Sequence, residues 1–242
     1  MDHGNIYLGC SGWAYPSWKP DFYPPTVSAK KLLEFYATRL NSVEVNYTFR
    51  SLPSETTVRS WLGATGEGFR FTFKSPQRIT HILRLNNCAE PLDRFARAIA
   101  PAVEMGRLGV ILFQLPPNMK ANAELLDGFL VEARRFPFRV SFEFRNTTWF
   151  TEPIYAILRN HSAALCIAES DDLTTPAEFT APFSCYRLRK ANYSASDLVN
   201  IRENLKAQAL RGDVFAYFKH EEDPTGALQA ASILEELRRN EA

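Results

Sequence analysis

Short hydrophobic runs of strand length alternate along the chain with longer segments whose apolar residues recur every three or four positions. The short runs are rich in Val, Ile, Phe and Tyr, which favour strands, and they cover residues 6–11, 42–46, 69–74, 109–114, 139–144, 163–168, 183–188 and 214–219. The longer segments have helical periodicity and cover residues 28–40, 54–64, 90–105, 122–135, 152–160, 196–210 and 226–239. This alternation predicts an α/β protein with a single (β/α)8, TIM-barrel-like domain over residues 1–242.

An open, doubly wound sheet is the alternative arrangement of the same elements. A dinucleotide-binding sheet of that kind carries a Gly-x-Gly-x-x-Gly turn after its first strand, and the sequence after residues 6–11 does not contain one. A P-loop motif is also missing from the sequence. The barrel is therefore favoured, and we expect no cofactor.

Polar residues recur on one face of several predicted strands and gather toward their carboxyl ends. Because side chains alternate between the two faces of a strand, these residues share the face opposite to the Val and Phe residues between them. The polar positions are Ser42, Glu44, Asn46, Arg70, Thr72, Lys74, Gln114, Ser141, Glu143, Arg145, Arg187, Arg189 and Lys219. The apolar face suits packing against helices, so the polar face is expected inside the barrel and at its mouth.

A barrel built only for stability would fill its interior with Val, Ile and Leu. Burying unpaired ions such as Glu44, Lys74, Glu143 and Arg187 costs several kcal/mol each. These side chains are therefore expected to pair with one another, to contact water or to meet a ligand. In such barrels the carboxyl ends of the strands carry the active site, although a structural network of ion pairs is an open alternative.

The overall charge excludes some partners. In 242 residues, 28 Lys and Arg oppose 27 Asp and Glu, so the net charge is +1 and a broadly polybasic nucleic-acid coat is excluded, whereas a local basic site is not. The longest apolar runs fall short of the roughly 20 residues that span a membrane. The first residues lack a secretory signal, and the four cysteines form no Cys-x-x-Cys pair. We expect a cytoplasmic protein with buried free thiols and no membrane contact.

Several short motifs are spread along nearly the whole chain. They are Gly-Cys-Ser-Gly-Trp at 9–13, Val-Glu-Val-Asn-Tyr-Thr-Phe at 43–49, Phe-Lys-Ser-Pro at 73–76, Phe-Gln-Leu-Pro-Pro at 113–117, Phe-Glu-Phe-Arg at 142–145 and Tyr-Arg-Leu at 186–188. Together they resemble the YecE-like family, a bacterial domain of unknown function with a TIM-barrel-like fold. The resemblance supports the barrel and implies no established activity. Arg50 stands where the family commonly has an aromatic residue, and Arg189-Lys190 and Lys219-His220 also depart from its pattern.

Basic residues gather after the seventh and eighth strands, which is the common phosphate position in these barrels. They are Arg187, Arg189, Lys190, Lys219 and His220. Arg presents a planar fork that matches phosphate or carboxylate, and Lys a compact charge. The cluster predicts an anion-binding corner, and a solvated charged rim is the alternative.

Glu44 and Glu143 are a candidate acid/base pair. In an enzyme, Glu143 would act as the base, with Lys74 and Arg145 stabilising developing negative charge. The alternative is that Glu143 only orients Lys74 or Arg187.

Further candidate ligand contacts come from other strand ends and loops. Asn46 and Gln114 would orient a substrate by hydrogen bonds, and Ser11 would donate one at the mouth. Trp13 belongs to a set of loop aromatics that would either stack on a ligand or pack as a lid. His81 would exchange protons near neutral pH.

A metal site is not expected. The four histidines lack zinc-site spacing. Glu169, Asp171 and Asp172 could hold Mg²⁺, but a solvated loop is the favoured interpretation.

Three functional hypotheses remain open. The first is a barrel enzyme or binding protein for a small anionic ligand, phosphorylated or nucleotide-like, with metal-independent acid/base chemistry. The second is nucleic-acid binding or processing, which is motivated by 20 Arg against 8 Lys and by aromatics near the mouth. The third is a non-catalytic binding module, which is motivated by the lack of a standard catalytic triad or metal set.

Overall fold

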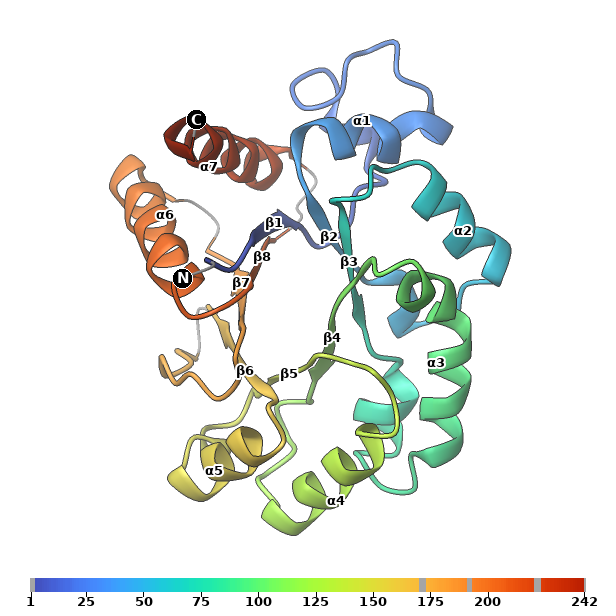
Figure 1. Ribbon diagram of the computed structural model, residues 1–242, viewed down its shortest axis with the longest axis vertical. Coiled ribbons are helices and arrows are strands. Elements are labelled where there is room, and N and C mark those ends of the chain that lie inside the picture. Colours follow the sequence, from blue (N-terminus) through green and yellow to red (C-terminus); the bar gives the residue numbers. More distant parts are fainter. Residues whose placement is uncertain (1–2, 170–172, 191–192, 220–222, 242) are drawn as a thin grey trace.

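Eight parallel strands form a closed barrel in the computed structural model, which describes residues 3–169, 173–190, 193–219 and 223–241. Each strand pairs with its neighbours in chain order, and β8 pairs with β1 to close the ring. The strands are β1 Ile6–Cys10, β2 Ser42–Val45, β3 Arg70–Lys74, β4 Leu108–Gln114, β5 Val140–Glu143, β6 Ala164–Ala168, β7 Ser184–Leu188 and β8 Val214–Phe218. Helices surround the ring (Figure 1), and the TIM-barrel-like fold is confirmed.

The surrounding helices follow the predicted segments closely. They are α1 Leu32–Arg39, α2 Glu55–Gly63, α3 Ala89–Glu104, α4 Ala123–Ala133, α5 Glu152–Asn160, α6 Ala195–Ala209 and α7 Thr225–Glu241. The first differs most, because Ala29–Lys31 forms a 3-10 turn and α1 begins only at Leu32. In the described part of the connection from β6 to β7 there is an isolated bridge from Glu169 to Thr174 but no helix. None of the helices in the described ranges combines the length and apolarity needed to cross a membrane.

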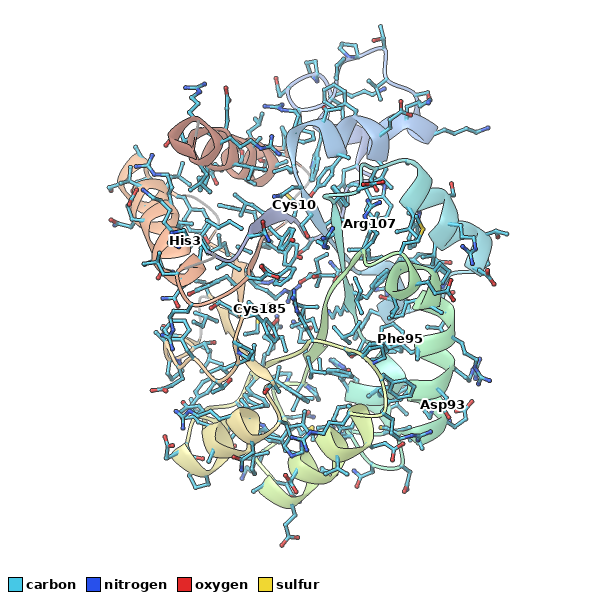
Figure 2. The ribbon with its side chains drawn as sticks, viewed as in Figure 1. His3, Cys10, Asp93, Phe95, Arg107 and Cys185 are labelled. Carbon is cyan, nitrogen blue, oxygen red and sulfur yellow. The ribbon has the colours of Figure 1, made fainter. Side chains whose placement is uncertain are left out.

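The outward-facing strand residues form the main core with the helices. Val43, Val45, Phe71 and Phe73 are at most 1% exposed and belong to this core, as the sequence alternation predicts. The inward-facing residues form separate small clusters. Leu112, Cys166 and Cys185 form one of these inside the ring, and Figure 2 shows Cys185 near its centre.

A chain of hydrogen bonds inside the barrel links β8 with β2 and β3. The Tyr217 hydroxyl donates to Oγ1 of Thr72 at 2.7 Å and lies 2.8 Å from Oγ of Ser42. Thr72 Oγ1 also accepts the backbone N–H of Val110 at 3.0 Å, where the pairing of β3 and β4 shifts register. A Cβ at Gly109 would lie 2.7 Å from that oxygen, so glycine is needed beside it. These hydrogen bonds satisfy polar groups buried inside the barrel, next in register to Glu44 and Arg187.

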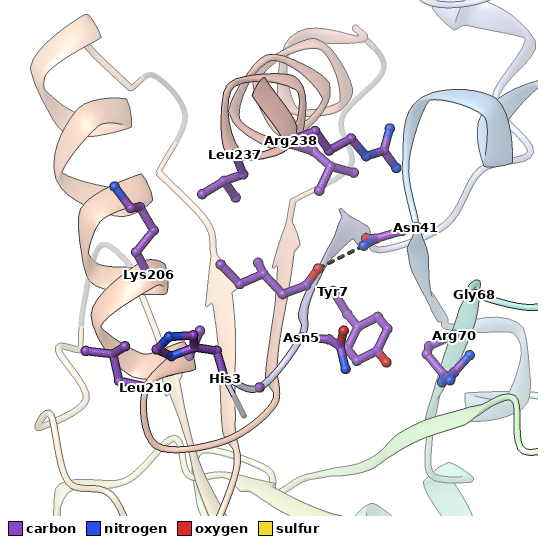
Figure 3. Close-up of a pocket in the computed structure, with 14 residues that line it drawn as sticks. His3, Asn5, Tyr7, Asn41, Gly68, Arg70, Lys206, Leu210, Leu237 and Arg238 are labelled. Atoms are coloured by element: carbon purple, nitrogen blue, oxygen red, sulfur yellow. Dashed lines mark hydrogen bonds between the residues drawn. The ribbon is translucent and has the colours of Figure 1, made fainter. Parts of the chain in front are cut away.

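A hollow of about 600 Å³ lies at the opposite, amino-terminal end of the strands, beside α6 and α7 (Figure 3). Its lining includes His3, Lys206 and Arg238, whose side chains are exposed and can be hydrated. Asn41 forms part of the wall and donates to the carbonyl of Ile6 at 2.8 Å. The hollow therefore has no need of a ligand to satisfy its charges.

Candidate functional site

The barrel mouth contains a cavity of about 620 Å³ at the carboxyl ends of the strands. Side chains from β3, β4 and β7, and from the loops after β1, β2, β5 and β7, line it. They are Tyr15, Asn46, Tyr47, Phe49, Arg50, Lys74, Gln114, Arg145, Arg187 and Arg189. Six of these residues are among the candidates from the sequence, so the alternating pattern brought together side chains from distant parts of the chain.

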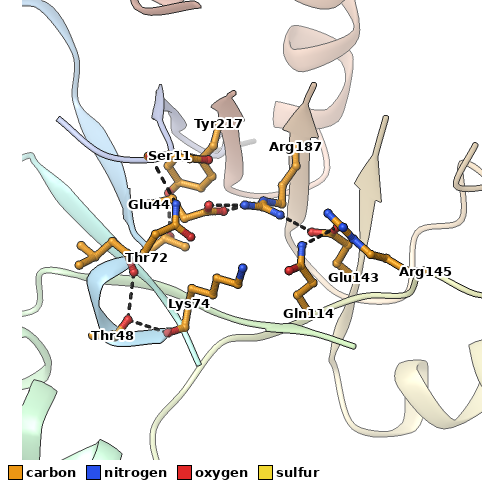
Figure 4. A network of polar contacts seen from close by, with 12 residues as sticks. Ser11, Glu44, Thr48, Thr72, Lys74, Gln114, Glu143, Arg145, Arg187 and Tyr217 are labelled. Carbon is orange, nitrogen blue, oxygen red and sulfur yellow. Dashed lines mark hydrogen bonds and ion pairs between the residues drawn. The ribbon is translucent and has the colours of Figure 1, made fainter. Parts of the chain in front are cut away.

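Arg187 lies at the centre of a buried ion network beneath this cavity (Figure 4). Its Nε and Nη2 donate to the two carboxylate oxygens of Glu44 at 2.8 and 2.6 Å, and its Nη1 donates to Glu143 at 2.5 Å. The three side chains are 1%, 0% and 2% exposed, respectively. Pairing and a bidentate fork offset the desolvation cost of burying these charges.

The second oxygen of Glu143 is also occupied. It accepts hydrogen bonds from Nε2 of Gln114 and from Nε of Arg145, both at 2.8 Å. Burial alone would raise the pKa of Glu143, but Arg187 and Arg145 outweigh it and hold the pKa far below its usual range. This carboxylate is ionised but is a weak base, since protonating it would break three charge-assisted or buried hydrogen bonds.

The pKa of Glu44 is set by the same opposing effects. Its burial raises the pKa, while the Coulombic and hydrogen-bonding effects of Arg187 more than compensate, so the pKa is lowered. In turn the pKa of Arg187 is raised, because Glu143 and Glu44 outweigh its burial. If Glu143 only orients another residue, that residue is Arg187, which donates a hydrogen bond to it at 2.5 Å.

Among the described residues at the mouth, positive charges outnumber negative ones. Lys74, Arg145 and Arg189 lie beside a network in which Glu44 and Glu143 are already engaged by Arg187. Nε of Arg189 is buried and has no hydrogen-bond partner in the described part of the chain, and burial and Arg187 lower the pKa of this residue. An uncompensated guanidinium in a cavity is costly unless an anion or water reaches it.

Lys74 points into the same space from the end of β3. Its Nζ lies 4.2 Å from the ring centroid of Phe49 and makes no hydrogen bond or ion pair with any residue that the structure describes. Burial and then Arg187 lower the pKa of Lys74 to about 8. This side chain is therefore partly neutral near physiological pH.

Other predicted contacts lie at the edge of the cavity. The Ser11 hydroxyl is buried and helps to lower the pKa of Glu44, although it forms no well-shaped hydrogen bond. Asn46 donates to the Ser11 carbonyl at 3.3 Å. Burial raises the pKa of Tyr15 to about 12, and its hydroxyl donates to the same carbonyl at 3.2 Å.

His81, Trp13 and Lys219 are not among the side chains that line the cavity. His81 packs edge-on against Phe49, with ring centroids 5.0 Å apart, and burial, Lys74 and Arg145 lower its pKa. Trp13 packs against Trp61, with centroids 5.4 Å apart. Lys219 follows β8, where its backbone N–H donates to the carbonyl of Leu188 at 2.8 Å.

The predicted basic corner is only partly assembled at the mouth. Arg187 and Arg189 reach the cavity, whereas Nζ of Lys190 lies 3.6 Å from Asp197 at the start of α6 and beside the ring of Tyr193. His220 is outside the described residues, as are Asp171 and Asp172. Within the described ranges, no three His, Cys, Asp or Glu side chains converge as they would on a metal ion.

The loop aromatics divide into two groups. Trp18, Phe22, Tyr23 and Trp149 are at most 1% exposed and pack in the core, as expected for a lid. Tyr15, Tyr47 and Phe49 line the cavity instead. The sequence places these three in the set of loop aromatics that would either stack on a ligand at the mouth or pack as a lid, but it does not point to Arg50 as a ligand contact. The unusual Arg at position 50 was the available signal, but its direction depends on the 3-10 turn Tyr47–Phe49.

Comparisons with known proteins agree with this fold. The family described as "Protein of unknown function DUF72" matches residues 7–242. UPF0759 protein YunF of Bacillus subtilis is 29% identical over 157 residues, which cover 62% of this chain and 54% of YunF. UPF0759 protein YecE of Escherichia coli K12 is 33% identical over 111 residues, which cover 46% of this chain and 38% of YecE. The chain thus matches about half the length of these relatives or less.

Solved structures show the same architecture. A DUF72 family protein from Thermotoga maritima superposes with a TM-score of 0.84 at 25% identity, covering 97% of this chain and 99% of the other. D-psicose 3-epimerase reaches a TM-score of 0.52 at 10% identity, with 98% of each chain covered, and shares the fold alone. On the extent of the family match, this chain belongs to DUF72, the UPF0759 family of YecE-like and YunF-like proteins of unknown function.

Proposed function

We propose that the barrel mouth binds a small anionic molecule through its phosphate or carboxylate group. The single observation that carries this proposal is the excess of positive charge in the cavity, where donors of Lys74 and Arg189 have no acceptor among the described residues. The two nearby carboxylates, Glu44 and Glu143, make their hydrogen bonds to Arg187, Arg145 and Gln114 instead.

The charged side chains form two groups, one that fixes Arg187 and one that is open to a ligand. Glu44 and Glu143 fix Arg187 at the base of the cavity, and Glu143 also holds Nε of Arg145. The terminal nitrogens of Arg145 make no hydrogen bond to the rest of the described chain, so they can donate to a ligand. Anion binding would satisfy these donors at little cost in side-chain entropy, because the arginines are already positioned.

The size of the cavity favours a small ligand. A volume of about 620 Å³ suits a sugar phosphate or a mononucleotide. Nucleic-acid binding would use cations spread along a backbone path, whereas the cations here converge on one cavity with Arg187 at its base. Acid/base chemistry at this site would start from Lys74 rather than Glu143, because the lysine is partly neutral and the carboxylate is fully engaged.

Calorimetry with inorganic phosphate, glucose 6-phosphate and glucose tests the proposal. We expect binding of the two phosphates and none of glucose. Arg189→Gln should weaken phosphate binding by tenfold or more, since it removes a charge-assisted contact. Arg135→Gln is the matched control, because Arg135 is exposed and pairs with Glu132 away from the mouth. Failure of all these phosphates and of simple carboxylates to bind at low salt would refute the proposal.

A further inference from the structure

Lys74 differs from other lysines of the chain in its surroundings. Lys31, Lys190 and Lys206 are exposed and each pairs with a carboxylate, on Glu34, Asp197 and Glu203, respectively. Lys74 is partly buried inside the barrel, and its amine has no such partner in the described chain. A desolvated amine beside another cationic group is an arrangement that activates lysine as a nucleophile.

We propose that Nζ of Lys74 forms an imine with the carbonyl group of a small ketone or aldehyde that carries a phosphate or carboxylate. This inference rests on the proposed function, because the anionic group is what would hold the substrate at Arg145 and Arg189. The carbonyl carbon would then lie over the end of β3, where Figure 4 shows the lysine amine projecting between the strands that carry Glu44 and Gln114.

The charged groups around Lys74 explain why it is available. Arg187 on β7 and Arg189 just after it repel its charged form, while Glu44 on β2 and Glu143 on β5 attract it. Burial and the arginines prevail, and the pKa of Lys74 falls to about 8. Compared with an ordinary lysine, this shift increases the neutral fraction at pH 7 by roughly two orders of magnitude. His81 is nearby on the loop after β3, with its own pKa lowered partly by Lys74.

The reaction balances without an oxidant or reductant. The Nζ lone pair forms the new C–N bond while the carbonyl π pair moves to oxygen. Both amine protons then leave with that oxygen as water, and a C=N bond remains. Protonation of the imine nitrogen produces a cation, which the face of Phe49, 4.2 Å from Nζ, would stabilise. Such an imine is an electron sink for breaking a bond next to the former carbonyl carbon.

Borohydride trapping tests this inference. The protein is incubated with dihydroxyacetone phosphate, pyruvate or dihydroxyacetone, reduced with borohydride, digested and mapped by mass spectrometry. We expect a reduced adduct at Lys74 with an anionic probe, formed at least tenfold faster than with uncharged dihydroxyacetone and at least tenfold faster than at any other lysine. Dihydroxyacetone phosphate and pyruvate distinguish a phosphate from a carboxylate anchor. The rate should rise with pH to a midpoint near 8.

Two variants serve as controls. Lys74→Arg keeps a positive charge but cannot form an imine, so labelling in its peptide should disappear. Lys120→Arg changes an exposed lysine and should leave trapping at Lys74 unaltered. Calorimetric binding of dihydroxyacetone phosphate with no adduct at Lys74 would overturn the inference and leave the proposed function standing. Equal labelling by the charged and uncharged probes would also overturn it. Absence of any anion binding would overturn both.

Discussion

Replacing Arg187 with methionine should destabilise the protein strongly and reverse the effect of pH on its stability. The substitution keeps an extended, largely apolar side chain but removes the shared partner of Glu44 and Glu143, both almost fully buried. Removing one partner of a buried ion pair costs about 3–5 kcal/mol. Arg145 and Gln114 still donate to Glu143, so Glu44 loses most. We therefore expect the free energy of unfolding to fall by about 3 kcal/mol, near the lower end of that range, which corresponds to a fall in Tm of roughly 6–12 °C.

The pH dependence identifies the cause. In the native protein the pKa values of both carboxylates are lowered, so the folded state binds fewer protons than the unfolded state in acid. That stabilisation is present above the unfolded pKa and is lost as the pH falls through the lowered values. Without Arg187, burial dominates and raises the pKa of Glu44. The folded variant then binds more protons than the unfolded chain, and its stability should rise relative to the parent between pH 7 and pH 5.

Urea unfolding at several pH values, followed by circular dichroism, measures both effects. Arg135→Met provides a matched control on the surface, where an ion pair contributes about 1 kcal/mol or less. The triple change Arg187→Met, Glu44→Gln and Glu143→Gln should recover much of the loss, since no charge is left unpaired. This account of the network would be refuted if Arg187→Met lowered the free energy of unfolding by less than about 1 kcal/mol. It would also be refuted if the variant kept the parent's dependence of stability on pH.

Three further predictions concern neighbouring groups. Arg189→Met should raise Tm by roughly 2–4 °C in scanning calorimetry, because it removes a buried, repelled charge, and an unchanged or lower Tm would contradict this. Tyr217→Phe should cost about 1–3 kcal/mol in urea unfolding, since it removes the hydroxyl bonded to Ser42 and Thr72, and a neutral effect would show that this chain is dispensable. Phosphate should raise the pKa of His81 in NMR titrations, because it offsets the lysine and arginine charges that lower that pKa; no change would place the anion elsewhere.

The fold could be predicted from the sequence because strands and helices each leave their own period in the pattern of apolar residues. Alternation along 42–46 and 69–74 separates residues that face the helices, such as Val43 and Phe71, from those that face inward, such as Glu44 and Thr72. The connection from β6 to β7 lacks helical periodicity and, in its described part, lacks a helix.

The partners inside the barrel could not be predicted in the same way. Arg187 is 143 residues from Glu44 and 44 residues from Glu143, and their contact depends on the stagger of strands around the ring. An arginine expected to contact a ligand therefore proves to be held by two carboxylates. Lys190 illustrates a second limit, because the start of α6 brings Asp197 within 3.6 Å of it, on the outer side of the strands. Position after a strand does not determine which way a loop side chain turns.

Stability alone does not account for the composition of the mouth. A layer of apolar residues would fill the barrel at similar or greater stability than the Glu44–Arg187–Glu143 network. The charges of the network compensate one another, whereas Lys74 and Arg189 add charges whose donors find no acceptor among the residues that the structure describes. Burial, and then repulsion by Arg187, lowers the pKa of both groups and costs folding free energy. An anion that enters the cavity removes that cost, so the same residues that weaken the empty barrel strengthen the complex. Because of this coupling, removing Arg189 should raise Tm and also weaken anion binding. A charge cluster with a purely structural role would not produce both effects.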